Sequence, residues 1–121
     1  MAELLPYILS ALVFMLLDVV SGLVKGASVG NLSSKKAREG LYHKCGYILA
    51  IILAVMCEYA TLSIELGIEI PLTIPVCVYI CMTEILSVLE NIMIINPDMS
   101  AFLSKYLKVS ENGEHFLDEK K

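Results

Sequence analysis

Charged side chains are scarce in this 121-residue chain, and tryptophan is absent. Asp, Glu, Lys and Arg make up 18% of the residues, whereas hydrophobic residues make up 57%. A soluble domain of this length is mostly surface and lacks the interior volume to bury so much apolar side chain. The composition therefore indicates a membrane protein. Basic residues do not gather beside aromatic residues in the sequence, so we expect no nucleic-acid partner.

The sequence also lacks the residue patterns of catalytic or metal sites. Its four cysteines lie in or beside apolar runs, where cysteine usually acts as a small hydrophobic residue. Cys77 and Cys81 share a helical face, but no third and fourth ligand follow at the spacing of a zinc site. His43 and His115 are isolated, and no nucleophile–base pair is recognisable. We expect no enzyme activity, no metal and no cofactor.

Three apolar stretches are long enough to cross the hydrocarbon layer, which takes roughly 20 helical residues. They cover about 4–24, 45–66 and 71–95. Residues 1–7 lack the basic segment of a secretory signal, so we expect the first stretch to be retained. Apolar residues recur at helical spacing over about 98–108, which predicts a short amphipathic helix in the membrane interface. The predicted fold is an all-α integral membrane protein, with a membrane domain over 1–107 and a charged cytoplasmic tail over 108–121.

Basic residues are unevenly distributed among the connections, which predicts the orientation of the chain. The connection between the second and third stretches has Glu65 and Glu69 but no Lys or Arg, and lysines follow the third stretch. Cytoplasmic connections are enriched in Lys and Arg. We therefore expect the N-terminus outside and the C-terminus and first connection in the cytoplasm. The basic residues of this cytoplasmic loop are Lys25, Lys35, Lys36, Arg38 and Lys44.

Four carboxylates fall within the apolar stretches, at Asp18, Glu58, Glu84 and Glu90. A charged carboxylate at mid-membrane costs roughly 3 kcal/mol on insertion scales, so such residues are functional candidates. No Lys or Arg lies inside the stretches. We therefore expect the carboxylates to be protonated, to face a packed interior, or to line water.

Small and polar residues accompany these carboxylates at three- and four-residue spacing, which indicates close helix packing. In the second stretch they recur every fourth residue up to Glu58, and we expect this seam to join copies of the chain. The predicted packing residues are Ser21, Gly22, Gly26, Gly46, Ala50, Ala54, Ser87 and Asn91.

Two blocks of the sequence resemble the toxin-secretion/phage-lysis holin family. The first block runs from Asp18-Val19-Val20-Ser21-Gly22 through Lys25, Ser33-Ser34-Lys35 and Gly40-Leu41 to Lys44. It is similar to the family pattern D-x-x-(T/S)-G-x-x-K-A, S-S-K and G-L-x-x-K. The second block, Glu84-Ile85-Leu86-Ser87-Val88-Leu89-Glu90-Asn91 with Pro97 and Leu103, is similar to the family segment E-x-x-S-I-x-E-N…P. Gly26 and Asn96 depart from the family pattern at single positions.

This resemblance implies a holin that forms homo-oligomers in the bacterial cytoplasmic membrane. Such a protein opens lesions or pores that release an endolysin, causing lysis, or a protein toxin. Two other functions remain open from the residues alone. One is a non-lytic membrane effector or adaptor that assembles into rings. The other is a small proton-coupled transporter, although that class uses about four spans and one dominant carboxylate.

Overall fold

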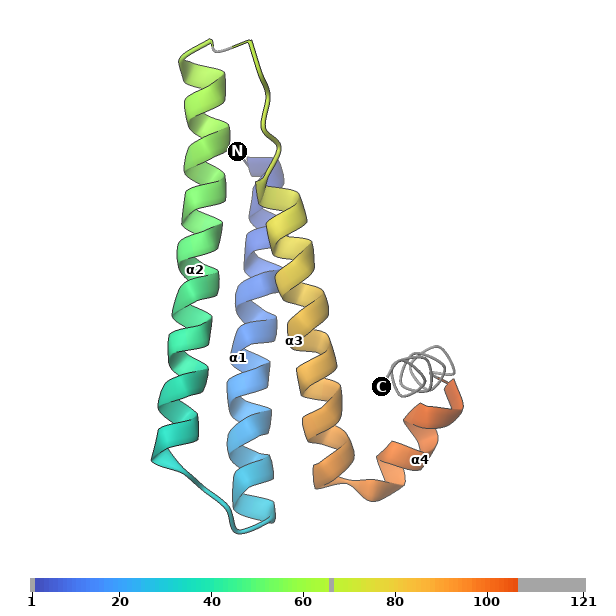
Figure 1. The fold of residues 1–121 in the computed structure, drawn as a ribbon. Coiled ribbons are helices and arrows are strands. Elements are labelled where there is room, and N and C mark those ends of the chain that lie inside the picture. The colour runs from blue at the N-terminus through green and yellow to red at the C-terminus, as the bar shows by residue number, and fades with distance from the viewer. Residues whose placement is uncertain (1, 66, 107–121) are drawn as a thin grey trace, which may run out of the picture.

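The computed structural model describes residues 2–65 and 67–106, which form helices joined by short connections. A short 3-10 turn, η1 (Ala2–Leu4), leads into α1 (Leu5–Ser28). Two long helices follow, α2 (Ser34–Ser63) and α3 (Thr73–Ile95), and then the short α4 (Pro97–Tyr106). In Figure 1, α1 and α3 run in the same direction and α2 runs opposite to both. Helix α4 turns aside from the end of α3.

Local sequence signals explain where the helices begin and end. Gly30 adopts a left-handed φ of 69°, and the N–H of Asn31 donates to the carbonyl oxygen of Gly26 at 2.8 Å, which ends α1. The Ser33 hydroxyl oxygen then accepts from the Lys36 N–H at 3.4 Å and caps the start of α2. Asn96 ends α3, and its side-chain oxygen accepts from the Met99 N–H at 3.3 Å, within the first turn of α4.

Within the described residues, three helices are long and apolar enough to span a membrane. At 1.5 Å per residue, the 24 residues of α1 extend about 36 Å and the 30 residues of α2 about 45 Å. Most large apolar side chains on these helices are exposed, including Leu16, Leu53 and Leu86. An apolar surface of this extent is stable in lipid rather than in water. The prediction of an all-α protein with three membrane-spanning helices is confirmed.

The apolar core is small and centred on the contact between α1 and α3, which pack most closely. Helix α2 touches this pair less extensively, mainly on the side of α3. An open, apolar groove of 410 Å³ lies between α2 and α3, lined by Ala50 on one helix and by Val76 and Ile80 on the other. The described bundle is thus a tight α1–α3 pair with α2 attached along one side. The core residues are Ala11, Met15, Ile51, Cys77 and Ile80.

The amphipathic helix expected over about 98–108 corresponds to α4, as far as Tyr106. Its first turn carries Asp98 and its last turn Lys105, an arrangement that complements the helix dipole. Its position in the membrane interface stays a prediction. Residues 107 and 108 and the expected charged tail lie outside the described residues.

Candidate functional site: a three-helix polar cluster

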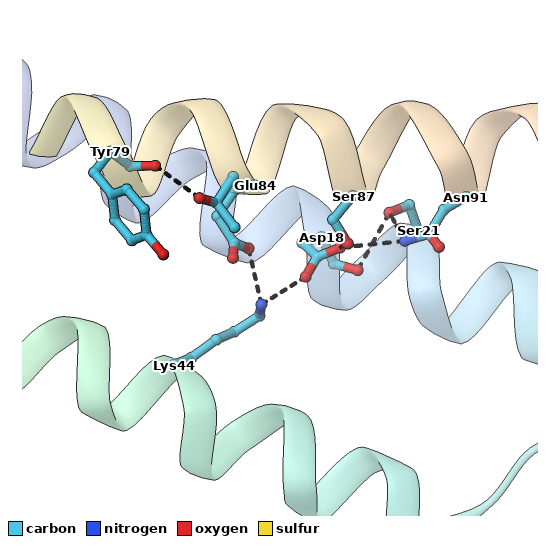
Figure 2. Close-up of polar contacts among 8 residues, drawn as sticks. Asp18, Ser21, Lys44, Tyr79, Glu84, Ser87 and Asn91 are labelled. Carbon is cyan, nitrogen blue, oxygen red and sulfur yellow. Dashed lines mark hydrogen bonds and ion pairs between the residues drawn. The ribbon is translucent and has the colours of Figure 1, made fainter. Parts of the chain in front are cut away.

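A buried ion-pair cluster connects the three spanning helices (Figure 2). The Lys44 ammonium of α2 donates to Asp18 Oδ2 of α1 at 2.6 Å and to Glu84 Oε2 of α3 at 2.8 Å. The exposed fractions of the three side chains are 13%, 16% and 4%. One cation therefore faces two carboxylates, and the three groups together have a formal charge of −1.

Three further polar residues extend this cluster along α1 and α3. Asp18 Oδ1 accepts from the Ser87 hydroxyl at 2.6 Å and from the Asn91 amide at 3.2 Å. The same Asn91 amide nitrogen donates to the Ser21 hydroxyl oxygen at 2.9 Å. Asp18 therefore accepts hydrogen bonds from both other spanning helices. We call these residues the polar cluster: Asp18, Ser21, Lys44, Glu84, Ser87 and Asn91.

The position of the cluster along each helix explains why the three charges meet. Asp18 lies ten residues before the end of α1, Lys44 ten residues after the start of α2, and Glu84 eleven residues before the end of α3. Ten helical residues extend about 15 Å. The three side chains therefore lie at similar depth, well inside the bundle. A buried charge is tolerated only when it is paired and hydrogen-bonded, as each of them is here.

The expectation that the membrane carboxylates lack a basic partner is wrong for Asp18 and Glu84. Lys44 directly precedes the second apolar stretch in sequence, and the charge pattern groups it with the basic loop. The structure places it inside α2, with its ammonium directed between the other two helices. Asp18 and Lys44 are each ten residues from the helix ends that the α1–α2 connection joins, and this spacing would have placed them at the same depth. In contrast, Lys35, Lys36 and Arg38 are exposed near the start of α2, and Lys25 is half-buried near the end of α1.

The other two carboxylates do not join the polar cluster. Glu58 of α2 forms a separate contact with the first residue of α3: its Oε2 accepts from the Thr73 hydroxyl at 2.9 Å and its Oε1 from the Thr73 N–H at 3.3 Å. This contact lies fourteen residues, or about 21 Å, from Lys44 along α2. Glu90 is exposed on α3. Thr73 is uncharged, so a search for charged residues within the apolar stretches did not identify it.

The predicted packing residues have different surroundings. Gly22 faces α3, where a Cβ would come within 3.8 Å of the Asn91 amide nitrogen. Gly26 instead packs against the connection after α1, because a Cβ there would lie 3.0 Å from Leu32 Cδ2. Along α2, Gly46 is exposed with open space beside it, whereas Ala54 is fully buried.

That the α2 seam joins copies of the chain stays a prediction, but Ala54 is buried within its own bundle. Its side chain has no exposed surface left for a second copy. Ile51 and Thr61 are the other buried residues of α2, at spacings that place all three on one face. Glu58 lies on this same face and contacts α3. The buried part of the seam thus attaches α2 within its own bundle, and Ala50 lines the groove beside it.

Comparison with known protein families identifies this chain. The sequence profile of the bacteriophage holin family matches residues 3–112, which include every residue of the polar cluster. Neither the curated proteins nor the solved structures contain a significant match. The profile covers most of the chain, and three membrane-length helices agree with a multi-pass membrane protein. The chain therefore belongs to the bacteriophage holin family.

Proposed function

We propose that copies of this protein associate in the bacterial cytoplasmic membrane and open lesions that release an endolysin or a protein toxin. Membership of the bacteriophage holin family supports a role in membrane opening. The observation that carries the proposal is the buried ion-pair cluster of Asp18, Lys44 and Glu84. Three charged side chains at this depth contribute little to the stability of a membrane protein, because each is energetically unfavourable there. Their presence therefore points to a function.

The cluster is suited to a protein with a closed and an open state. In the closed bundle, Lys44 offsets the two carboxylates, and Ser87 and Asn91 donate to Asp18. In an open lesion, water can solvate the same polar groups while the exposed leucine, isoleucine and valine side chains stay on lipid. Ion pairs and hydrogen bonds stabilise the charged groups in the closed state, and hydration stabilises them in the open state. A modest difference in free energy therefore decides which state is populated.

Expression from an inducible promoter in bacteria is expected to stop growth abruptly and to depolarise the cytoplasmic membrane. The physical reason is the exchange of ion pairs for water in an open lesion. Membrane potential and culture density would be followed together, and protein in the membrane fraction would be quantified. Co-expressed endolysin should cause lysis only after depolarisation. A non-lytic adaptor would instead accumulate while growth and potential continue, and that result contradicts the proposal.

We further propose the orientation that the basic residues indicate, with the α1–α2 connection and the C-terminus in the cytoplasm. Glu69 and Lys35 are both exposed, near opposite ends of α2. In a variant without the native cysteines, a membrane-impermeant thiol reagent added outside intact cells should modify Glu69→Cys and spare Lys35→Cys. Permeabilised cells, in which both thiols should react, serve as the control. Modification of Lys35→Cys alone in intact cells would show the reverse orientation.

A further inference from the structure

Helix α2 is attached to the α1–α3 pair by apolar packing of Ile51 and Ala54 and by two polar contacts. One is Lys44, which reaches both other helices, and the other is Glu58, which contacts Thr73. Apolar contact adds little to helix association in lipid, since lipid tails are as apolar as the side chains they replace. An open groove beside Ala50 runs between α2 and α3. The polar contacts therefore contribute strongly to whether α2 stays in place.

Helices α1 and α3 have a different kind of contact. They share most of the apolar core, and Ser87 and Asn91 of α3 donate directly to Asp18 of α1. None of these contacts requires α2. Removal of α2 would leave this pair joined and would uncover Asp18 and Glu84, the two carboxylates that Lys44 contacts. Ser87, Asn91 and Ser21 continue the polar α1–α3 face from Asp18 along the contact between these two helices.

We propose that α2 is the element that moves away when the lesion opens, that Lys44 determines when it does so, and that the uncovered α1–α3 face lines the water. This inference rests on the proposed function and specifies its moving part. Departure of Lys44 leaves two carboxylates, Asp18 and Glu84, without their cation. In lipid that arrangement is costly, whereas water solvates both groups. Movement of α2 is therefore coupled to the entry of water. The closed bundle persists until copies of the chain have assembled and can enclose water between them.

The first test reverses the charge of Lys44 and then restores the pairing. Lys44→Asp places three carboxylates together and should bring depolarisation forward, by roughly threefold to tenfold for a membrane polar contact of ordinary strength. The double variant Lys44→Asp/Glu84→Lys again has one cation between two carboxylates and keeps Asp18 as the acceptor for Ser87 and Asn91, so its timing should return toward that of the unmodified protein. Lys35→Asp changes the net charge equally at an exposed position. It should leave the timing unchanged, because the remaining basic residues still define the orientation.

Several outcomes of this test would overturn the role of Lys44. One is that Lys44→Asp depolarises the membrane at the same time as the unmodified protein when both are present in the membrane in equal amounts. Equally early opening by Lys44→Asp and by the double variant is another, because restored pairing would then have no effect. If Lys44→Asp fails to accumulate, recovery of both accumulation and timing in the double variant supports the pairing. Failure of that recovery counts against it.

The second test identifies the face that meets water, in a background without native cysteines. Ser87 lies in the polar cluster, whereas the adjacent Leu86 is exposed on the outer surface of the bundle. A membrane-impermeant thiol reagent should leave Ser87→Cys unmodified before depolarisation and modify it afterwards. Leu86→Cys should stay unmodified at both times. If the cells depolarise and Ser87→Cys stays unmodified, this inference is wrong while the proposed function stands. If the cells never depolarise, the proposed function itself fails.

Discussion

Asp18→Leu is expected to destabilise the bundle by about 2 kcal/mol more than Glu84→Leu. Each substitution removes one carboxylate and leaves Lys44 paired with the other, so the charge balance of the two variants is the same. They differ in hydrogen bonding. Asp18 accepts from Ser87 and Asn91 in addition to Lys44, whereas Glu84 accepts from Lys44. Leaving buried donors unsatisfied costs about 1–3 kcal/mol each, and membrane contacts lie toward the lower end.

The comparison discriminates between hydrogen bonding and the ion pair with Lys44 as the dominant effect. Glu84 is the more deeply buried of the two side chains, with 4% of its surface exposed against 16% for Asp18. If the ion pair with Lys44 dominated, Glu84→Leu would have the larger effect, because water screens the more buried pair less. The free energy of unfolding would be measured for both purified variants in the same detergent. Asp18→Asn, which retains an acceptor oxygen, should fall between Asp18→Leu and the unmodified protein. An equal or larger loss for Glu84→Leu would contradict the assigned hydrogen bonding.

Ala54→Leu is expected to loosen α2 and to bring membrane opening forward. Ala54 is fully buried on the α2 face that carries Ile51 and Glu58. A leucine there needs space that the bundle does not contain, and overpacking of this kind costs about 1–3 kcal/mol. The added side chain should push α2 away from the other helices, although its greater hydrophobicity favours membrane insertion. The free energy of unfolding in detergent and the time of depolarisation would be measured together.

Gly46→Leu is the matched control for this substitution, because it lies on the same helix and introduces the same side chain. Gly46 is exposed, and a Cβ there meets no atom within 4 Å. Its leucine should point into lipid, so stability should be unchanged or slightly raised by the better helix propensity. Delayed opening with shorter crosslinked oligomers for Ala54→Leu would instead indicate a contact between copies. That result would contradict the position of Ala54 within its own bundle.

Hydropathy alone was sufficient to predict the membrane-spanning fold. A span requires about 20 apolar residues, and no soluble alternative can bury three such stretches in so short a chain. The two sequence blocks around Asp18 and Glu84 likewise predicted the family, which the match over residues 3–112 confirms. These properties are encoded locally, in composition and short motifs, and need no knowledge of how the helices pack.

Only the tertiary structure decided which polar residues meet. Helical spacing placed Ser87 and Asn91 on the same face as Glu84, but could not show that α1 and α3 pair while α2 lies beside them. Helical spacing also could not predict the direction of the Lys44 side chain, because a lysine next to an apolar stretch can extend toward the interface or turn into the bundle. The side chain turns inward because Asp18 and Glu84 lie at the same depth on neighbouring helices. That match of depth depends on how three separate helices align, which periodicity within one helix does not determine.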